Sequence, residues 1–217
     1  MQIVSKGQSC FFVVAQRAKQ EQVRILIDPF EPAASKKVSF PEADIVLFSQ
    51  HGNDGDFKTV TGESFVVATP GEYEIKDVAI RGIASFRDNT KGKERGANTI
   101  YTIEVEAMRI CHLGFLGQHE LTSGQVELIG NVDVLMIPTG GAETIGSKSA
   151  AAIVHQLEPR LVIPMQYAPA GAKGKMESVD MFLKEMGAKD VQPQQKLSVK
   201  PKDLSDEGTV VAVISVS

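Results

Sequence analysis

The stretch Val46-Leu47-Phe48-Ser49-Gln50-His51-Gly52-Asn53-Asp54-Gly55-Asp56 is an apolar run that ends abruptly in a polar, glycine-bearing loop. This pattern is typical of a buried strand that delivers its C-terminal end to the edge of a sheet. Loops at such edges often carry binding and catalytic residues. The stretch therefore predicts a sheet with a functional site at one edge.

Short apolar runs with turn residues between them surround this stretch in the first half of the chain. Runs of this length and spacing predict strands. We expect them at residues 10–15, 23–29, 44–49, 64–69, 78–85, 99–106 and 109–113. A polar, Lys/Gly-rich loop at residues 88–97 is too long for a tight hairpin. The first half is thus predicted to be rich in β-structure.

The second half alternates strands and helices. Residues 132–138 and 160–165 are apolar at nearly every position, as strands covered on both faces are. A helix at 147–158, stopped by Pro159, separates them, so the three segments predict a βαβ unit with a parallel strand pair. Further helices are expected at 122–130 and 178–186 and a last strand at 209–216.

These elements predict an α/β fold in which two sheets pack face to face and helices cover both outer surfaces. With 217 residues and 42% apolar residues, the chain can fill a substantial core, and we expect one domain spanning residues 1–217. The net charge of −4 gives no overall attraction to nucleic acid or to acidic membranes. No apolar run reaches the roughly 20 residues of a membrane helix, so we expect a cytoplasmic protein.

The two cysteines, Cys10 and Cys111, both lie in apolar surroundings. Buried free thiols are therefore favoured over a disulfide, and neither thiol has the features of a nucleophile.

Several motifs, taken together, resemble the metallo-β-lactamase-fold hydrolases, and within them the branch of ascorbate-6-phosphate lactonase and related metal-dependent hydrolases. The motifs are KGQSCF (residues 6–11), LIDPF (26–30), ADIVLFS (43–49), PGEYE (70–74), KERGANTIY (93–101), CHLG (111–114) and IPM (163–165). They run in the family's order along nearly the whole chain. The resemblance implies a four-layer αββα sandwich with the site at one edge of the paired sheets.

The resemblance also implies a one- or two-metal centre, built in the family from a His-x-His-x-Asp-His loop, two further histidines and a bridging aspartate. Such ligands hold Zn²⁺ or Mn²⁺ and leave a position open for the water that becomes the nucleophile. Here the corresponding positions are Gln50, Gly52, Asp54, Gly55, Arg87, Phe115 and Gln166. Only Asp54 keeps the family's residue type, and an N-terminal family histidine corresponds to Gln8.

The replacements are compatible with one another. Gln50 and Gln166 keep polarity without binding zinc well, Phe115 fills space, and Arg87 supplies a positive charge where a cation is missing. We expect Arg87 to pair with Asp54, because a lone buried carboxylate is costly.

Other polar residues carry weaker hypotheses. His51 with Asp54 and Asp56 is an alternative, shifted metal site, although a solvated turn explains these residues as well. His112 is expected to be a packed, hydrogen-bonded histidine rather than a catalytic one. Glu72 and Glu74 are an alternative acid/base pair, although a structural role in a turn is simpler.

Basic side chains in glycine-bearing loops are expected near the rim of the site, where they can attract a small anionic ligand. They are Lys91, Lys93, Arg95, Lys173 and Lys175, and the alternative is that they are simply solvated. The candidate ligand-binding residues are Gln8, His51, Asp88, His112, Lys93 and Arg95.

The sequence thus favours a protein with a degenerate metal site and no metal cofactor, which acts as a non-hydrolytic binding or assembly module. Its expected partners are a second copy of itself or an active paralogue, and neither nucleic acid nor a membrane. The alternative is a hydrolase of lactones or phosphoesters that recruits zinc or manganese through an atypical ligand set including Asp54 and Asp88.

Overall fold

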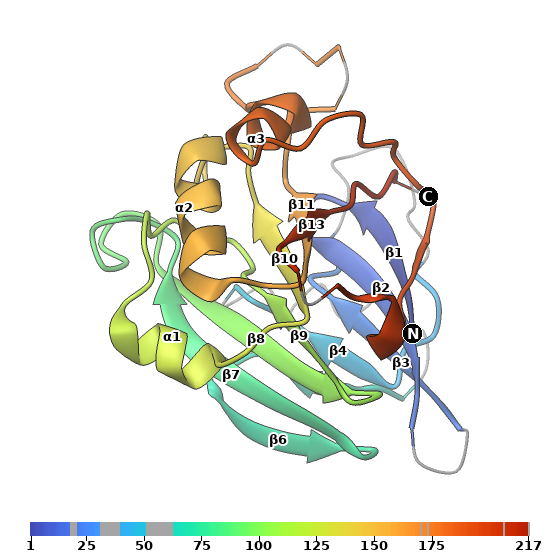
Figure 1. Ribbon diagram of the computed structural model, residues 1–217. Helices are drawn as coiled ribbons and strands as arrows, with labels where there is room; N and C mark the ends of the chain where they lie inside the picture. The colour runs from blue at the N-terminus through green and yellow to red at the C-terminus, as the bar shows by residue number, and fades with distance from the viewer. Residues whose placement is uncertain are drawn as a thin grey trace.

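Two β-sheets face each other across one apolar core in the computed structural model, which describes residues 1–17, 21–30, 40–50, 63–169, 171–172, 174–205 and 207–216 (Figure 1). Alternate residues of each strand point into this core, which holds Ile3, Val13 and Ile25 from one sheet and Ile103 and Met136 from the other.

The first sheet has six strands in the order β12-β1-β2-β3-β4-β5. Their bounds are β1 Gln2–Gly7, β2 Cys10–Gln16, β3 Gln22–Ile27, β4 Ile45–Leu47, β5 Phe65–Val67 and β12 Leu197–Ser198. The pairings from β12 to β3 are antiparallel, whereas β3, β4 and β5 run parallel. The C-terminal ends of β3 and β4 therefore lie at the same edge.

The second sheet has seven strands in the order β13-β11-β10-β9-β8-β7-β6. Their bounds are β6 Gly71–Ile75, β7 Val78–Phe86, β8 Ala97–Val105, β9 Met108–His112, β10 Val134–Pro138, β11 Leu161–Met165 and β13 Val210–Val211. β6 to β9 form an antiparallel meander, and β9, β10, β11 and β13 are parallel. The expected βαβ unit is confirmed: α2, Ser147–Leu157, connects the parallel strands β10 and β11.

Three α-helices cover the outer face of the seven-stranded sheet: α1 Ser123–Ile129, α2 and α3 Val179–Glu185 (Figure 1). Ile129, Ile153 and Phe182, one from each helix, belong to a second apolar cluster together with residues of β7 to β11. The described residues thus contain both sheets and one of the two expected helical layers. A short 3₁₀-helix, η3 Pro201–Asp203, precedes β13.

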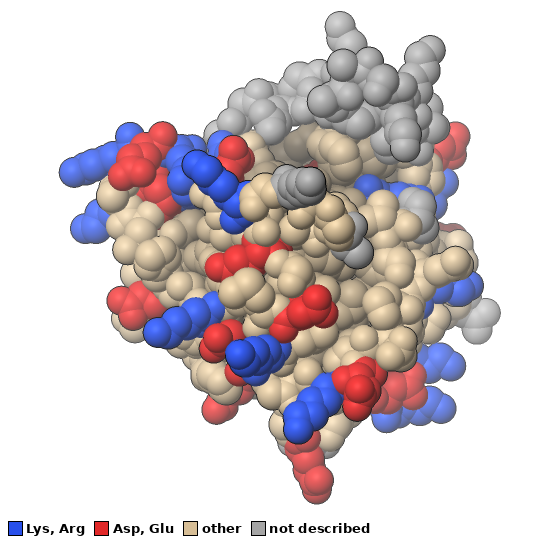
Figure 2. All heavy atoms as spheres, turned by 90° about the horizontal axis from the view of Figure 1, so that it is seen from above, with Lys and Arg blue, Asp and Glu red and all other residues tan. Residues whose placement is uncertain are grey.

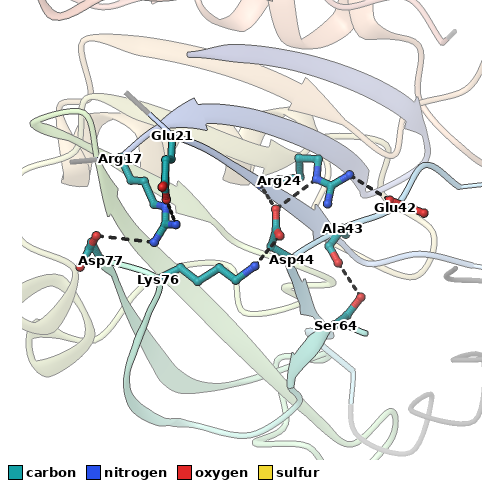
Figure 3. A network of polar contacts seen from close by, with 9 residues as sticks. All are labelled: Arg17, Glu21, Arg24, Glu42, Ala43, Asp44, Ser64, Lys76 and Asp77. Atoms are coloured by element: carbon teal, nitrogen blue, oxygen red, sulfur yellow. Dashed lines mark hydrogen bonds and ion pairs between the residues drawn. The ribbon is translucent and has the colours of Figure 1, made fainter. Parts of the chain in front are cut away.

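A polar network joins the two sheets at the N-terminal end of β4 (Figure 3). Asp44 accepts hydrogen bonds from Arg24 Nε at 3.1 Å and from Lys76 Nζ at 2.6 Å. Arg24 belongs to β3, whereas Lys76 lies in the turn between β6 and β7 of the other sheet. Arg17 forms ion pairs with Glu21 and with Asp77 of the same turn. This end of the sandwich is therefore held by charge pairs.

The structure differs from the sequence prediction at four strands, one of which is the two-residue strand β12, which was not expected. β1 and β6 were not expected, because residues 2–7 lack a continuous apolar run and residues 70–73 have a turn composition. Pairing with β2 and β7 makes both segments strands. The run at 209–216 was expected to be one strand, but β13 ends at Val211, and Val216 forms an isolated bridge with Ser5 of the other sheet.

Cys10 and Cys111 are free and buried, as expected. Burial raises the pKa of both thiols. In the described ranges, no helix combines the length and the apolar character that crossing a membrane requires.

Candidate functional site

The edge where the parallel strands end brings most of the predicted positions together. In the seven-stranded sheet, Arg87 follows β7 and Gln166 follows β11, and Phe115 stands three residues after β9. In the facing sheet, Gln50 stands three residues after β4, and Gln8 lies in the turn between β1 and β2. The strand directions, rather than sequence proximity, create this arrangement.

Asn98 links two of these positions, and the sequence analysis gave it no role. Gln50 and Asn98 form an isolated antiparallel bridge between the two sheets. The fully buried Asn98 side chain accepts a hydrogen bond from Phe115 N at 2.8 Å and donates to Ser85 Oγ at 2.7 Å and to Leu113 O at 3.0 Å. The only signal in the sequence was its place within the family motif at residues 93–101.

Arg87 packs against Phe115. The guanidinium carbon lies 5.5 Å from the centre of the Phe115 ring, within cation–π range. Arg87 Nε is buried and has no hydrogen-bond partner in the part of the chain that the structure describes. The expected ion pair of Arg87 with Asp54 stays a prediction, because Asp54 lies outside the described residues.

Gln8 and Gln166 are brought together across the two sheets. Gln166 N donates to Gln8 O at 3.3 Å, and both residues have left-handed backbone conformations with φ of 52° and 53°. The Gln8 side chain is exposed, whereas Gln166 is 5% exposed. Neither Oε1 nor Nε2 of Gln166 has a hydrogen-bond partner among the described residues.

A buried polar cluster lies beneath this edge and joins the two sheets. Asp28, after β3, accepts hydrogen bonds from Ser49 N and Ser49 Oγ, both at 2.7 Å. His112 Nδ1 lies 4.0 Å from Asp28 Oδ2 and accepts a hydrogen bond from Gly114 N. His112 Nε2 must therefore carry the proton that is shared with Ser9 O at 2.9 Å. Asp28 lies in the motif at residues 26–30, but no feature of the sequence pointed to a role for its carboxylate.

Burial sets the protonation of this cluster. Desolvation raises the pKa of Asp28, against the opposing effects of His112 and of hydrogen bonds from Ser49 and Ser9. Desolvation lowers the pKa of His112, against the opposing effect of Asp28. His112 is thus held as a neutral, fully enclosed imidazole. Such a group supports the site from below and is not accessible to a substrate.

Asp88 organises its own loop. It accepts hydrogen bonds from the backbone N–H groups of Thr90, Gly92, Glu94 and Arg95 at 2.7–3.0 Å and from Thr90 Oγ1. Desolvation acts to raise the pKa of Asp88, but these hydrogen bonds hold it well below its usual range. Its carboxylate oxygens are therefore already engaged.

The basic rim residues that the structure describes are exposed: Lys91, Lys93, Arg95 and Lys175. On the face drawn in Figure 2, Lys and Arg side chains are interspersed with Asp and Glu side chains. This is not the single-sign surface that nucleic-acid binding favours. His51, Gly52, Asp54, Gly55, Asp56 and Lys173 lie outside the described residues.

Glu72 and Glu74 lie on β6, at the far edge of the seven-stranded sheet. Glu72 pairs with Arg81 of the neighbouring strand at 2.9 Å. This arrangement fits a structural role for Glu72 rather than an acid/base pair.

At the positions that the family resemblance assigns to metal ligands, the side chains of the described residues do not fit a zinc or manganese centre. Gln50 and Gln166 are weak ligands, Phe115 has no lone pair, and Arg87 is a permanent cation. Among the described residues, no group of three or more His, Cys, Asp or Glu side chains is placed to hold a metal ion.

The chain is similar to known proteins over most of its length. A family model described as "Beta-lactamase superfamily domain" matches residues 2–166. A protein of Thermococcus onnurineus named UPF0173 metal-dependent hydrolase is 31% identical over 189 residues, which cover 74% of this chain and 82% of that protein. A relative of the same name from Pyrococcus furiosus is 28% identical over 190 residues, with the same coverage.

The similarity extends to a solved structure. The crystal structure of a candidate Zn-dependent hydrolase of the metallo-beta-lactamase superfamily from Thermotoga maritima is 31% identical and superposes with a TM-score of 0.77. The match covers 99% of both chains. Both sheets and the edge described above thus have counterparts in a known fold.

Proposed function

The chain belongs to the beta-lactamase superfamily, and from this premise we propose that it lacks the family's metal centre and acts as a non-hydrolytic binding or assembly module. The observation that carries the proposal is the contact of Arg87 with Phe115, at the positions of a family histidine and of the bridging aspartate. Without a metal ion, the fold has no metal-bound water to use as a nucleophile.

Electrostatics supports this reading. A guanidinium stays protonated at any physiological pH, so Arg87 repels a divalent cation at close range. The ring of Phe115 presents an apolar surface where a shared carboxylate would stand. Removing one ligand weakens a metal site, but these two residues oppose metal binding directly.

The buried cluster of Asp28, Ser49, Ser9 and His112 supplies the order that a metal ion would otherwise give to this edge. Hydrogen bonds join Asp28 to Ser49 and His112 to Ser9, and His112 Nδ1 lies 4.0 Å from Asp28 Oδ2, so the ends of β3 and β9 meet inside this buried cluster. Such networks rigidify a site when every member is satisfied. The binding edge is thus held by protein groups alone.

The alternative function is a metal-dependent hydrolase of lactones or phosphoesters with an atypical ligand set. The names of the relatives favour it, because they are called metal-dependent hydrolases. It requires Asp54 and Asp88 to bind zinc or manganese. Asp88 would first have to give up the backbone hydrogen bonds that order residues 88–96.

Metal analysis of the purified protein tests the proposal. We expect zinc, manganese and iron at well below one ion per chain, even after incubation with each metal. One or two tightly bound ions per chain would overturn the proposal. Hydrolysis of generic esters that a chelator abolishes would support the alternative.

A restoration variant provides the matched comparison. It combines Gln50→His, Gly52→His, Gly55→His, Arg87→His, Phe115→Asp and Gln166→His. We expect this variant to bind zinc, while the unmodified chain does not. Equal zinc binding by both proteins would show that the replaced positions do not decide metal affinity.

We further propose that the module works in the cytoplasm, as a homo-oligomer or with an active paralogue. The two free thiols support a reducing compartment. Size measurement by light scattering and co-purification with a tagged paralogue test the assembly. If the protein is a monomer and captures no paralogue, the proposed assembly role is excluded and small-molecule binding remains.

A further inference from the structure

Four of the six buried and unpartnered side-chain polar atoms of the described residues belong to residues at this same edge, and the other two are Arg17 Nε and Thr99 Oγ1. Buried side-chain polar atoms in proteins nearly always have a hydrogen-bond partner. Gln166 Oε1, Gln166 Nε2, Thr139 Oγ1 and Arg87 Nε have none. Each of these residues comes directly after a strand of the seven-stranded sheet: Arg87 after β7, Thr139 after β10 and Gln166 after β11.

Thr139 and Gln166 are neighbours. Pro138 and Met165 are the last paired residues of β10 and β11, and the two polar residues follow them directly. The backbones also approach closely here, because a Cβ added to Gly140 would lie 2.0 Å from Gln166 O. A larger residue at position 140 would therefore push the turn that carries Gln166 out of place.

The guanidinium of Arg87 reaches toward the same strands. Arg87 itself follows β7, but its side chain lies over Phe115, which comes after β9, the strand next to β10. Three polar groups are thus associated with the ends of β9, β10 and β11, which are consecutive in the sheet. Adjacent strands are about 4.8 Å apart, so these ends span roughly 10 Å.

The free groups indicate the chemistry of a ligand. Both polar atoms of one planar carboxamide are unpaired, so the best partner is a planar group with an adjacent donor and acceptor. The N6 and N7 edge of adenine is such a group, and glutamine pairs with it in a bidentate manner. Arg87 complements an anionic substituent, as guanidinium groups do for phosphate.

Resting on the proposed non-hydrolytic binding function, we propose that this edge binds an adenine nucleotide, with Gln166 pairing with the base and Arg87 with the phosphate. The ligand forms hydrogen bonds with both polar atoms of the Gln166 carboxamide. Binding involves no chemical reaction.

Calorimetric titration of the full-length protein with AMP tests the proposal, with IMP and ribose 5-phosphate as comparisons. On the edge that carries N7, IMP presents two acceptors where adenine presents a donor and an acceptor, so a base held in the same orientation leaves Gln166 Oε1 unpaired. We expect AMP to bind at least about tenfold more tightly than either comparison compound. AMP binding that is undetectable, or no tighter than that of IMP, would overturn the proposal.

Two glutamine variants separate binding from structure. Gln166→Met removes two unpartnered atoms, so we expect about a tenfold loss of AMP affinity without a lower thermal midpoint. Gln156 is the control, since its carboxamide is bonded to Leu121 N at 3.0 Å and Leu121 O at 3.3 Å. Gln156→Met should lower the thermal midpoint and leave AMP affinity unchanged. The reverse pattern would assign Gln166 a structural role only.

A crystal structure with AMP and metal analysis of the same sample complete the test. Base density on Gln166 supports the inference, whereas only ordered water on its carboxamide overturns it. A metal-free protein that does not bind AMP contradicts this inference alone. A protein with one or two bound ions contradicts the proposed function itself.

Discussion

At the scale of single residues, His112 is an enclosed imidazole whose two ring nitrogens are both engaged by backbone groups. Its pKa is lowered in the folded protein, mainly by desolvation. The unfolded chain therefore binds a proton more readily than the folded one. The stability that neutral His112 contributes is present above its unfolded pKa, near 6.5, and is lost as the pH falls through the folded value.

We therefore expect the stability advantage of the native chain over His112→Gln to shrink as the pH falls from about 7.5 to about 5.5. Asp28 changes the comparison in the same direction. In His112→Gln the facing imidazole no longer lowers the pKa of Asp28, so the folded variant binds a proton more readily and gains stability relative to the native chain as the pH falls. Urea unfolding at several pH values measures the difference. The control is Leu128→Gln on the exposed side of α1, which changes no titratable group and should show a constant difference. If the stability advantage of the native chain over His112→Gln is unchanged at low pH, this account is contradicted.

Asp44 is the residue on which the polar network of Figure 3 converges. Desolvation acts to raise the pKa of Asp44, but hydrogen bonds from Arg24 and Lys76 outweigh it and hold the pKa well below its usual range. Its stabilising contribution is therefore present above the unfolded pKa, near 4, and is lost as the pH falls toward the folded value.

Asp44→Asn should cost about 1–2 kcal/mol of unfolding free energy at neutral pH, and the cost should decrease below about pH 4. Urea titrations at pH values on both sides of this range measure it. Glu72→Gln is the matched control, since Glu72 also pairs with an arginine but is far more exposed. It should cost less than about 0.5 kcal/mol. Equal costs for the two variants would show that the network adds nothing to an ordinary surface pair.

At the scale of elements, α1 depends on its capping box. Thr122 Oγ1 accepts a hydrogen bond from Gln125 N at 3.2 Å, and Gln125 Oε1 accepts one from Thr122 N at 3.0 Å. Gln125 Nε2 also donates to Ala84 O of β7 at 2.9 Å. The cap therefore both starts the helix and attaches it to the sheet.

Thr122→Ala should lower the unfolding free energy by about 1 kcal/mol, because a helix N–H loses its acceptor. Ser178→Ala is the control, since Ser178 occupies the N-cap of α3 without a side-chain capping bond. Chemical denaturation measures both, and we expect a change of under about 0.5 kcal/mol for the control. A similar loss in the two variants would mean that capping is not the cause.

At the scale of the whole molecule, Tyr101 joins the two sheets from within the core. Its hydroxyl group, on β8, donates to Phe48 O at 2.9 Å and lies 3.3 Å from Val67 O in the facing sheet. Phe48 follows β4 directly, so this contact fixes the start of the loop that the site requires. Desolvation raises the pKa of Tyr101, which keeps the hydroxyl protonated as a donor.

Tyr101→Phe should cost about 1–2 kcal/mol, since carbonyl groups of the facing sheet lose a buried donor. Tyr73→Phe removes a hydroxyl that bonds to Thr69 at the exposed edge and should cost less than about 0.5 kcal/mol. Thermal unfolding compares them. We also expect faster hydrogen exchange at Phe48 N in Tyr101→Phe alone. Equal exchange rates at Phe48 N in the two variants would show that the Tyr101 hydroxyl does not hold the start of the loop in place.

The sequence by itself determined the elements whose signals are local. Thr122 and Gly130 delimit α1, and Pro159 follows the end of α2, because caps and breakers act through adjacent backbone groups. The continuous apolar runs of β10 and β11 predict strands that are buried on both faces. The family motifs, read in order, were enough to anticipate the sandwich.

Only the tertiary structure decided which polar groups meet. β1 and β6 are strands because a neighbouring strand pairs with them, and no local pattern could show this. Asp28 and His112 are 84 residues apart in the chain, and Asn98 and Gln50 are 48 apart, yet strand pairing and sheet packing bring them together. Burial and hydrogen bonding depend on neighbours distant in sequence, so the state of Gln166 and the contact of Arg87 with Phe115 were visible only in the folded chain.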